Sequence, residues 1–323
     1  MPRILLVKTS SMGDIIHNMP LIADIRRHYP EAIIDWVVEE TFAEIAALSP
    51  HIDQFIILPL RHWKKNLLSN ETRHELCAFR RKLRARQYDA ILDTQALLKS
   101  ALISTWARGP SHGPNRQTAR EPLAGMLYTH SYDISPKLHA ITRTRMVAAA
   151  AFGYNLDELP LTYDLRVPEV TLPIAPLPAF VLGFHSTARD AKLWPVTHWV
   201  AMGKYLASLG LGLLLPWGSE TERLRAQAIA EQIPGSVVLP RMSLSQLTCL
   251  IQQAKLTVGL DTGLMHIAVA LDIPTLAIFC DTHIWQAGAM PAASDHAITI
   301  GGKHVLPSVA EATAAIDQLL KTA

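Results

Sequence analysis

The sequence is poor in cysteine and has no long apolar run. Its three cysteines, Cys77, Cys249 and Cys280, are widely spaced, which fits reduced thiols in a core and argues against a disulfide framework or a metal cluster. No apolar run approaches the ~20 residues that span a bilayer. The "ILLV" ahead of Lys8 is too short for the apolar part of a secretory signal. We therefore expect a cytoplasmic protein.

The common motifs of nucleotide, metal and redox chemistry are missing as well. No Gly-x-Gly-x-x-Gly follows a predicted strand, so a dehydrogenase that binds NAD(P) lacks its usual fingerprint. The sequence has no Walker A motif, no His-Glu-x-x-His, no Cys-x-x-Cys and no clear Asp-x-Asp pair. These absences argue against P-loop nucleotide hydrolases, zinc proteases and thiol redox enzymes.

The chain does contain enough apolar sequence for large cores, and its charge is unevenly distributed. Of its 323 residues 49% are hydrophobic, which suffices for two domains. The net charge is only +2, yet the basic segment, residues 61–86, holds nine Lys and Arg against two acidic residues. Such a segment attracts a polyanion such as nucleic acid, anionic lipid or a phosphorylated glycan, although a solvated helix face looks the same. His62 and Trp63 within "RHWKK" favour a ligand surface.

Strand-like and helix-like segments alternate along the chain, which predicts parallel sheets with crossover helices. Strands are expected at 3–8, 32–38, 54–60, 89–94, 179–187, 211–218, 236–240, 256–263 and 275–280. Helices are expected after Asp14 and at 71–86, 194–210, 220–232, 243–254 and 308–322. The pattern predicts two doubly wound Rossmann-like α/β domains that face a central cleft.

Proline density sets the expected domain boundary. A proline-rich linker over 168–178 separates an N-terminal domain over 1–167 from a C-terminal domain over 179–310. A terminal helix over 311–323 could pack on either domain, including back on the first. A cleft between two such domains suits an enzyme that binds a nucleotide donor on one side and an acceptor on the other.

In the first half, candidate site residues follow two strands. The stretch "VKTSSMGDIIHNMP" places Asp14 between a strand and a helix, where open α/β sheets bind ligands. The alternative is that Asp14 only complements the positive end of that helix. Asp93, Gln95 and Lys99 follow the fourth strand near the same crevice, and Arg120 lies further on, where a polyanionic acceptor would find it.

In the second half, the strongest local signal is "LTVGLDTGLMHIAVAL". Asp261, Thr262 and Gly263 stand where a strand gives way to a helix, and backbone N–H groups at such a turn can bind a diphosphate. His266 lies one turn further on. The alternative is that Asp261 and Thr262 are capping residues and that His266 is a buried histidine with its hydrogen bonds satisfied.

Two more strand ends contribute polar groups. Ser186 and Thr187 could donate hydrogen bonds, and Lys192 could neutralise a leaving phosphate, although a lone surface lysine is usually solvated. Beyond the next strand, Trp217 precedes Glu222, whose carboxylate could bind ribose hydroxyls or stabilise the first turn of its own helix.

Seven segments in order carry a resemblance over essentially the whole chain: KTSSMGDIIHNMP, DWVVEE, DTQALLKS, QTAREPLA, ARDAKLWP, LPWG and DTGLMHIAVALD. Together they resemble glycosyltransferase family 9, and within it the heptosyltransferase I group of lipopolysaccharide inner-core synthesis. The resemblance implies a GT-B fold, ADP-heptose as donor, a hydroxyl of Kdo2-lipid A as acceptor and inverting transfer. With a lysine and a helix terminus facing the leaving group, no metal or other cofactor is expected. The basic segment would hold the protein peripherally on the anionic inner face of the inner membrane, with no nucleic acid as partner.

The resemblance also implies residue roles. Asp14 resembles the catalytic base, Lys192 the phosphate-binding lysine and Asp261 the donor-sugar contact. The other expected donor residues are Ser186, Thr187, Trp217, Glu222, Met242, Thr262, Gly263 and His266. The expected acceptor residues are Gly13, Arg61, Lys64, Asp93, Gln95, Lys99 and Arg120.

Two departures from the family pattern concern the donor loops. Ala188 replaces one of two adjacent hydroxyl residues, and the segment 280–283 reads Cys-Asp-Thr-His where the family tends to read Gly-Pro-Thr-Asp-Pro. Two alternatives stay open. One is a type II enzyme that acts on an already heptosylated core, and the other is a non-catalytic protein that binds a nucleotide sugar or a nucleic acid.

Overall fold

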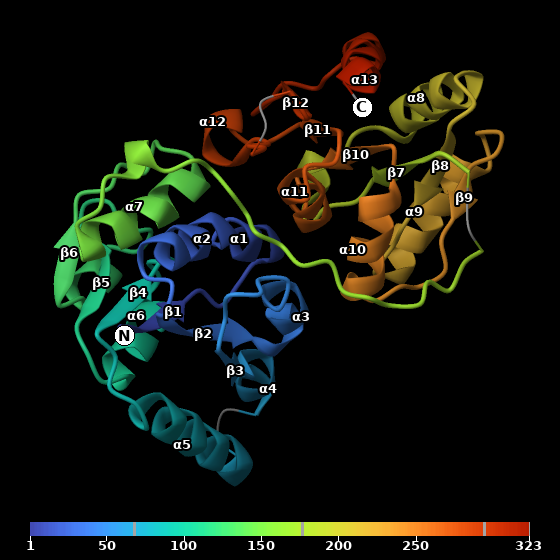
Figure 1. Cartoon of the computed structure of the whole chain (residues 1–323). Coiled ribbons are helices and arrows are strands. Elements are labelled where there is room, and N and C mark those ends of the chain that lie inside the picture. The colour runs from blue at the N-terminus through green and yellow to red at the C-terminus, as the bar shows by residue number, and fades with distance from the viewer. Residues whose placement is uncertain (67–68, 176–177, 293–294, 323) are drawn as a thin grey trace. The chain divides into compact units, whose positions relative to one another are not determined.

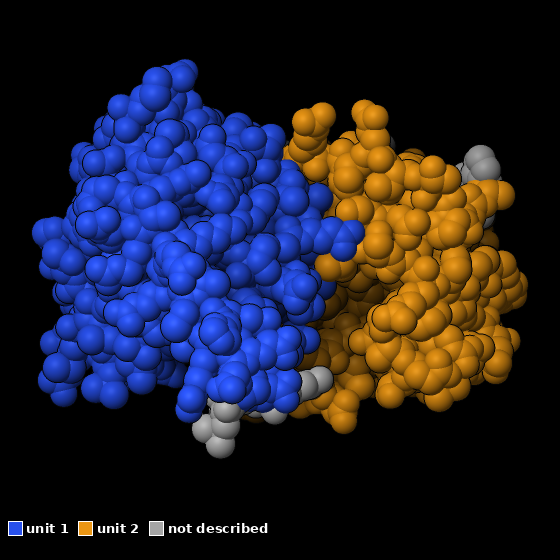
Figure 2. All heavy atoms as spheres, turned by 90° about the horizontal axis from the view of Figure 1, so that it is seen from below, with its two compact units in different colours: residues 1–164 blue, residues 165–323 orange. Residues whose placement is uncertain are grey.

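The computed structural model describes residues 1–66, 69–175, 178–292 and 295–322. The chain divides into two compact units, Met1–Asp164 and Leu165–Ala323 (Figure 2). Each unit has a parallel six-stranded sheet of its own (Figure 1). The expected linker belongs to the second unit, where the described residues 165–172 carry neither helix nor strand, and its residues 176–177 lie outside the described part.

The sheet of the first unit has the strand order β3-β2-β1-β4-β5-β6. Its strands are β1 (Arg3–Val7), β2 (Ile33–Glu39), β3 (Gln54–Leu58), β4 (Ala90–Asp93), β5 (Ser111–Pro114) and β6 (His130–Tyr132). The first four were predicted, because buried parallel strands read as apolar runs. Strand β5 and the edge strand β6 were not predicted, because "SHGP" and "HSY" offer no such run.

Helices follow the strands as crossovers in this unit. They are α1 (Met12–Ile16), α2 (Met19–His28), η1 (Glu40–Phe42), α3 (Ala43–Ala46), α4 (Leu60–Lys65), α5 (Asn70–Arg84), α6 (Leu98–Trp106), η2 (Ala124–Met126), α7 (Ala140–Phe152) and η3 (Leu156–Glu158). Helix α5 begins and ends within two residues of the prediction. Helix α7 packs against α2 and β4, and the sequence pattern had not indicated it.

One expectation about the basic segment is wrong. Trp63 was expected to contribute to a ligand surface, but its side chain is buried in the core of the first unit, with its ring edge-on to Phe79. Its indole N–H donates to Glu75 at 2.8 Å, and His62 lies 3.1 Å from the same carboxylate. The apolar part of "RHWKK" therefore anchors α4 to α5.

The sheet of the second unit repeats this topology, with the order β12-β11-β10-β7-β8-β9. Its strands are β7 (Phe180–Phe184), β8 (Gly212–Leu215), β9 (Val237–Val238), β10 (Leu256–Leu260), β11 (Thr275–Phe279) and β12 (Ala297–Gly301). Its helices are η4 (Asp190–Lys192), α8 (Val196–Ser208), α9 (Glu220–Ala230), α10 (Leu244–Gln253), α11 (Gly263–Ala270), α12 (Ile284–Ala287) and α13 (Val309–Thr322). Strand β12 was not predicted.

The terminal helix α13 belongs to the core of the second unit. It packs against α8, β11 and β12, and Ala312, Ile316 and Leu319 are fully buried there. The sequence left open whether this helix packs on the N-terminal or on the C-terminal domain. In the structure it belongs to the C-terminal unit.

Both sheets have one point at which the strand order reverses. In the first unit it lies between β1 and β4, and in the second between β7 and β10. Loops that leave the carboxyl ends of such neighbouring strands diverge and form a crevice in which α/β proteins bind ligands. The loops at these two positions carry Asp14 in the first unit and Lys192 and Asp261 in the second, so each unit has one candidate site.

Candidate functional site

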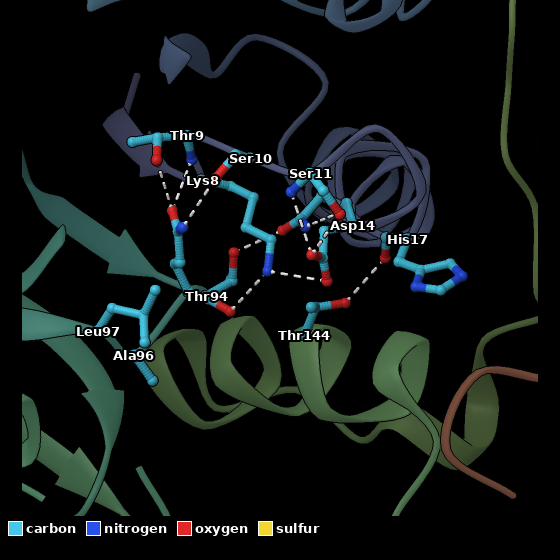
Figure 3. A network of polar contacts seen from close by, with 12 residues as sticks. Lys8, Thr9, Ser10, Ser11, Asp14, His17, Thr94, Ala96, Leu97 and Thr144 are labelled. Carbon is cyan, nitrogen blue, oxygen red and sulfur yellow. Dashed lines mark hydrogen bonds and ion pairs between the residues drawn. The ribbon is translucent and has the colours of Figure 1, made fainter. Parts of the chain in front are cut away.

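In the first unit, Asp14 stands between a helix start and a lysine. It lies in the first turn of α1, and its Oδ2 accepts from the backbone N–H of Ser11 at 3.1 Å and from the Ser11 hydroxyl at 3.0 Å (Figure 3). Its Oδ1 lies 3.4 Å from Nζ of Lys8, which follows β1 directly. Asp14 thus caps the helix, which was the structural alternative for this residue. It also presents a carboxylate at the crevice, which the functional interpretation required.

The charge of Asp14 is fixed by these neighbours. Burial alone would raise the pKa of the Asp14 carboxyl, but the Lys8 ammonium, the His17 ring and the Ser11 hydrogen bonds outweigh it. The pKa of Asp14 therefore lies well below its usual range, and the group is an ionised carboxylate at neutral pH. The side chain of Asp14 is 32% exposed, whereas that of Lys8 is only 6% exposed. The carboxylate can accept a proton from a bound hydroxyl group.

A pocket of about 60 Å³ opens beside this pair. Its polar lining includes Lys8, Asp14, Thr94, Gln95, Arg120 and Arg143. Arg143 projects from α7, and its buried Nε has no hydrogen-bond partner within the described part of the chain. Burial lowers the pKa of Arg143, and the charge of Asp14 partly restores it. Three cations around one carboxylate make the pocket suited to an anionic ligand that also carries a hydroxyl group.

The loop after β4 braces this pocket. Gln95 accepts from the backbone N–H of Thr9 at 2.8 Å and from the Thr9 hydroxyl at 2.9 Å. Asp93 is fully buried, accepts from the Tyr128 hydroxyl at 2.8 Å and receives two amide hydrogens of its own loop. Burial raises the pKa of Asp93. The structure therefore gives Asp93 a role in shaping the loop and leaves it no exposed atom for an acceptor.

Other acceptor residues named from the sequence lie around Glu39, at the end of β2. Lys99 Nζ lies 3.1 Å from Glu39 Oε1, and Arg61 Nε lies 3.9 Å from Glu39 Oε2. The Arg61 side chain is largely exposed and therefore free to meet a ligand. Gly13 is the second residue of α1. The side chain of Lys64 lies outside the described residues.

In the second unit, Asp261 gathers three side chains at the end of β10. Lys192 Nζ donates to Asp261 Oδ2 at 2.5 Å, and the Thr282 hydroxyl donates to the same oxygen at 2.7 Å. His266 Nε2 lies 3.8 Å from Oδ1. Burial alone would raise the pKa of Asp261, but its hydrogen bonds with His266, Lys192 and Thr282 hold it well below the usual range. The sequence prediction placed Lys192 and Asp261 in one site, and the structure brings them together.

The two predicted hydroxyl donors have partners inside the protein. The Thr187 hydroxyl donates to the backbone oxygen of Asp261 at 3.0 Å, which ties the β7 loop to the β10 loop. The Ser186 hydroxyl lies 2.9 Å from Nδ1 of His185, whose Nε2 lies 3.1 Å from the carbonyl oxygen of Pro216. Because Nε2 must donate to that carbonyl, Nδ1 accepts and Ser186 is the donor. A phosphate would have to compete for both hydrogens.

The remaining predicted donor residues lie after β8, β9 and β10. Trp217 donates its indole N–H to the carbonyl oxygen of Leu239 at 2.7 Å. Glu222 accepts from the backbone N–H of Gly218 at 2.6 Å and so caps α9, which was the structural alternative for this residue. Met242 is half-buried just ahead of α10, and Thr262 and Gly263 open α11.

The segment 280–283, whose sequence departs from the family pattern, forms two ion pairs through Asp281. Asp281 Oδ2 lies 3.7 Å from Arg189, and Asp281 Oδ1 lies 3.4 Å from His304. Asp281 therefore links the loop that carries Lys192 to the loop after β12. Thr282 keeps the hydroxyl that meets Asp261.

Sequence reasoning missed Lys8 and Arg143. Lys8 follows β1 at the same strand end as Asp14, so its position in the sequence could have identified it as a site residue. Arg143 lies on α7, which was not predicted, and only the packing of that helix brings it to the pocket. Within the described ranges, no three His, Cys, Asp or Glu side chains gather as metal ligands would. None of the described helices is long and apolar enough to span a membrane.

Comparisons with known proteins agree on one family. The family model "Glycosyltransferase family 9 (heptosyltransferase)" matches residues 76–311. Lipopolysaccharide heptosyltransferase 1 of Escherichia coli K12 is 38% identical over 281 residues, which is 87% of this chain and 88% of the relative. Lipopolysaccharide heptosyltransferase 2 of Salmonella typhimurium is 27% identical over 297 residues, which is 86% of this chain and 82% of that protein.

Solved structures extend this agreement to the fold. The E. coli heptosyltransferase WaaC with ADP superimposes with a TM-score of 0.88 at 34% identity, covering 98% of this chain and 99% of that one. WaaC with ADP-2-deoxy-2-fluoro heptose gives a TM-score of 0.83 at 33% identity, with the same coverage. These matches confirm the predicted GT-B type of fold, with two parallel-sheet α/β domains. The chain is an enzyme that belongs to glycosyltransferase family 9, the heptosyltransferases.

Proposed function

We propose that the protein transfers heptose from ADP-heptose to a hydroxyl group of Kdo2-lipid A, with inversion at the anomeric carbon. The observation that carries the proposal is the Lys8–Asp14 pair beside a cationic pocket, 3.4 Å apart. The Lys192–Asp261 pair occupies the corresponding strand ends of the second unit. Similarity to heptosyltransferase 1 and to WaaC solved with ADP and a fluorinated ADP-heptose supports this choice of substrates.

In the proposed reaction, Asp14 is the general base. One carboxylate oxygen of Asp14 takes the proton of the acceptor hydroxyl as that oxygen bonds to the anomeric carbon of the heptose. The bond from the anomeric carbon to the β-phosphate oxygen breaks, and ADP leaves with the electron pair. General-base assistance of this kind contributes typically ~10²–10⁴ in rate. Asp14 is deprotonated at neutral pH, as this step requires.

The second unit binds the donor in this proposal. Lys192 meets the charge that develops on the leaving diphosphate, together with the backbone N–H groups at the start of α11. Asp261 contacts the heptose, and Glu222, Trp217 and Met242 surround the nucleoside. Because Lys192 is paired with Asp261, the diphosphate must share the Lys192 ammonium with that carboxylate. Lys192 and the helix terminus supply the positive charge, so we propose that no divalent metal is needed.

The first unit binds the acceptor. A Kdo sugar carries a carboxylate and several hydroxyl groups, and the pocket offers Lys8, Arg120 and Arg143 for the carboxylate and Asp14 for a hydroxyl. Arg61 and Lys99 lie near Glu39 and would meet the phosphates or the second sugar. The exposed arginines of the basic segment hold the enzyme on the anionic face of the inner membrane.

The test follows ADP release from ADP-heptose in the presence of one of two acceptors. We expect release that depends on deacylated Kdo2-lipid A and is much slower with the same acceptor already carrying a heptose. Release that requires the heptosylated acceptor would move the assignment to the type II enzyme. Tight binding of ADP-heptose without turnover on either acceptor would favour a non-catalytic nucleotide-sugar binding protein.

A further inference from the structure

We propose that an apolar patch on the first unit inserts into the lipid surface from which the enzyme takes its acceptor. The apolar patch consists of Leu98 and Leu102 on α6 and of Leu123, Met126 and Leu127 around η2. Its biological purpose rests on the proposed function, because only a lipid-linked acceptor makes membrane insertion useful. The insertion itself can be measured without any sugar.

The five side chains are exposed although they are large and apolar. Their exposed fractions run from 36% for Leu127 to 60% for Leu123. Leu98 and Leu102 are four residues apart on one helix and therefore share a face. Leu123, Met126 and Leu127 have the corresponding spacing around a helical turn. Soluble proteins rarely gather exposed apolar side chains in this way without a binding partner.

The patch has a fixed frame. Helix α6 and the η2 turn pack against each other through the buried residues Ala101, Ala124 and Tyr128. The backbone N–H of Leu98 donates to Glu121 at 2.6 Å. A Cβ added at Gly125 would lie 2.5 Å from the backbone nitrogen of Arg116, so this turn is pressed against its own loop. The exposed side chains are therefore presented by a rigid surface, and their exposure does not come from a frayed end.

Charge around the patch selects the kind of partner. Helix α5 packs beside α6 and carries five exposed basic side chains, Arg73, Arg80, Arg81, Lys82 and Arg84. On the chain segment that leads into η2, Arg116 and Arg120 are exposed as well. An apolar centre with basic flanks matches a bilayer that has anionic headgroups, because the side chains enter the acyl boundary while the cations stay among the headgroups.

The patch is also continuous with the acceptor pocket. Ala96 and Arg120 line the pocket. Leu98 of the patch lies two residues after Ala96, and Leu123 of the patch lies three residues after Arg120. Both segments are joined directly, because the N–H of Glu121 donates to the carbonyl oxygen of Ala96 at 3.1 Å. A lipid-anchored sugar could thus enter the pocket while its acyl chains stay in the layer that the patch enters.

The experiment measures sedimentation of the full-length protein with phosphatidylcholine vesicles that contain phosphatidylglycerol. The test variant is Leu123→Ser with Met126→Ser, two exposed positions that should not affect folding. The matched control is Leu209→Ser with Leu224→Ser, two exposed leucines of the second unit. We expect the test variant to bind at least tenfold more weakly and the control to bind like the wild type, with part of the wild-type binding surviving high salt.

Three outcomes would overturn the proposal. Equal vesicle binding by the test variant and the wild type would show that the patch does not insert. Binding that high salt abolishes completely would show that the basic segment acts alone. A concentration-dependent dimer that disappears in the test variant, with vesicle binding unchanged, would assign the patch to a second copy of the chain. The test variant should keep wild-type turnover on the deacylated acceptor. Absence of that turnover in the wild type would count against the proposed function and leave the vesicle result standing.

Discussion

Lys8 and Asp14 form an ion pair of 3.4 Å at the carboxyl end of β1, and the same ammonium lies 3.4 Å from the carbonyl oxygen of Thr94 beyond β4. The lysine thus bridges the two strands between which the sheet order reverses. It also sets the charge of the proposed base, because its ammonium lowers the pKa of Asp14. A base held this way is ionised over a wide pH range but is a weaker proton acceptor than an isolated carboxylate.

Replacing Lys8 by Met should shift the acid limb of the pH profile of kcat/KM. An opposite charge at this distance lowers a carboxyl pKa by roughly 1–3 units, so its removal should move the limb upward by up to that amount. The sign follows from the charge, since loss of a cation favours the protonated carboxyl. The profile should be recorded with the deacylated acceptor. An acid limb in the same place would mean that Asp14 does not control it.

Arg143 should act on acceptor binding. Arg143→Met removes a cation whose Nε is buried and unpartnered within the described chain, so we expect KM for the Kdo acceptor to rise about tenfold or more, as for a lost hydrogen bond to a charged group. KM for ADP-heptose should change little. Arg143→Lys should recover part of the loss. An equal rise in both KM values would indicate a general effect on folding.

Lys192→Gln should weaken donor binding. The residue is half-buried beside Asp261 and faces the proposed diphosphate, and charged hydrogen bonds of this kind contribute about 1.5–3 kcal/mol. Calorimetric titration with ADP should therefore show Kd at least tenfold higher. Lys204→Gln, an exposed lysine on α8, serves as the matched control. Unchanged ADP affinity in Lys192→Gln would remove this lysine from the donor site.

Acid should destabilise the second unit through His185. Burial, with the nearby Arg225, lowers the pKa of His185 to about 4, whereas an unfolded histidine titrates near 6.5. Between these values the unfolded state binds the extra proton, so stability falls as the pH drops from about 6.5 toward 4. The full loss is about 3 kcal/mol. Urea unfolding at several pH values should show a shallower loss in His185→Gln, and parallel curves would contradict the assignment.

The prediction of the fold from the sequence succeeded where burial dictates the residues. The central strands β1, β4, β7 and β10 are apolar because helices cover both of their faces. It failed for β5 and for the edge strand β6, because "SHGP" and "HSY" pair with their neighbours without an apolar run. It also failed for α7, because the two faces of this helix differ little in hydrophobicity and the sequence therefore does not reveal which face packs against α2.

The candidate site shows the same division. Asp14, Lys192 and Asp261 could be named because they lie at or shortly after the ends of predicted strands, where ligand loops begin. Arg143 could not, because it reaches the pocket through the packing of an unpredicted helix. Asp93 looked like a crevice residue, but the structure turns its carboxylate toward Tyr128, a contact 35 positions away in the sequence.

The most direct measurement of the central claim compares wild type and Asp14→Asn in two assays. Asn keeps the shape of the side chain and can still cap α1, so the ADP-heptose Kd and the melting temperature should stay close to the wild-type values. Transfer to deacylated Kdo2-lipid A should show kcat reduced by ~10²–10⁴. A kcat within a few-fold of wild type, with the same donor affinity, would contradict Asp14 as the base.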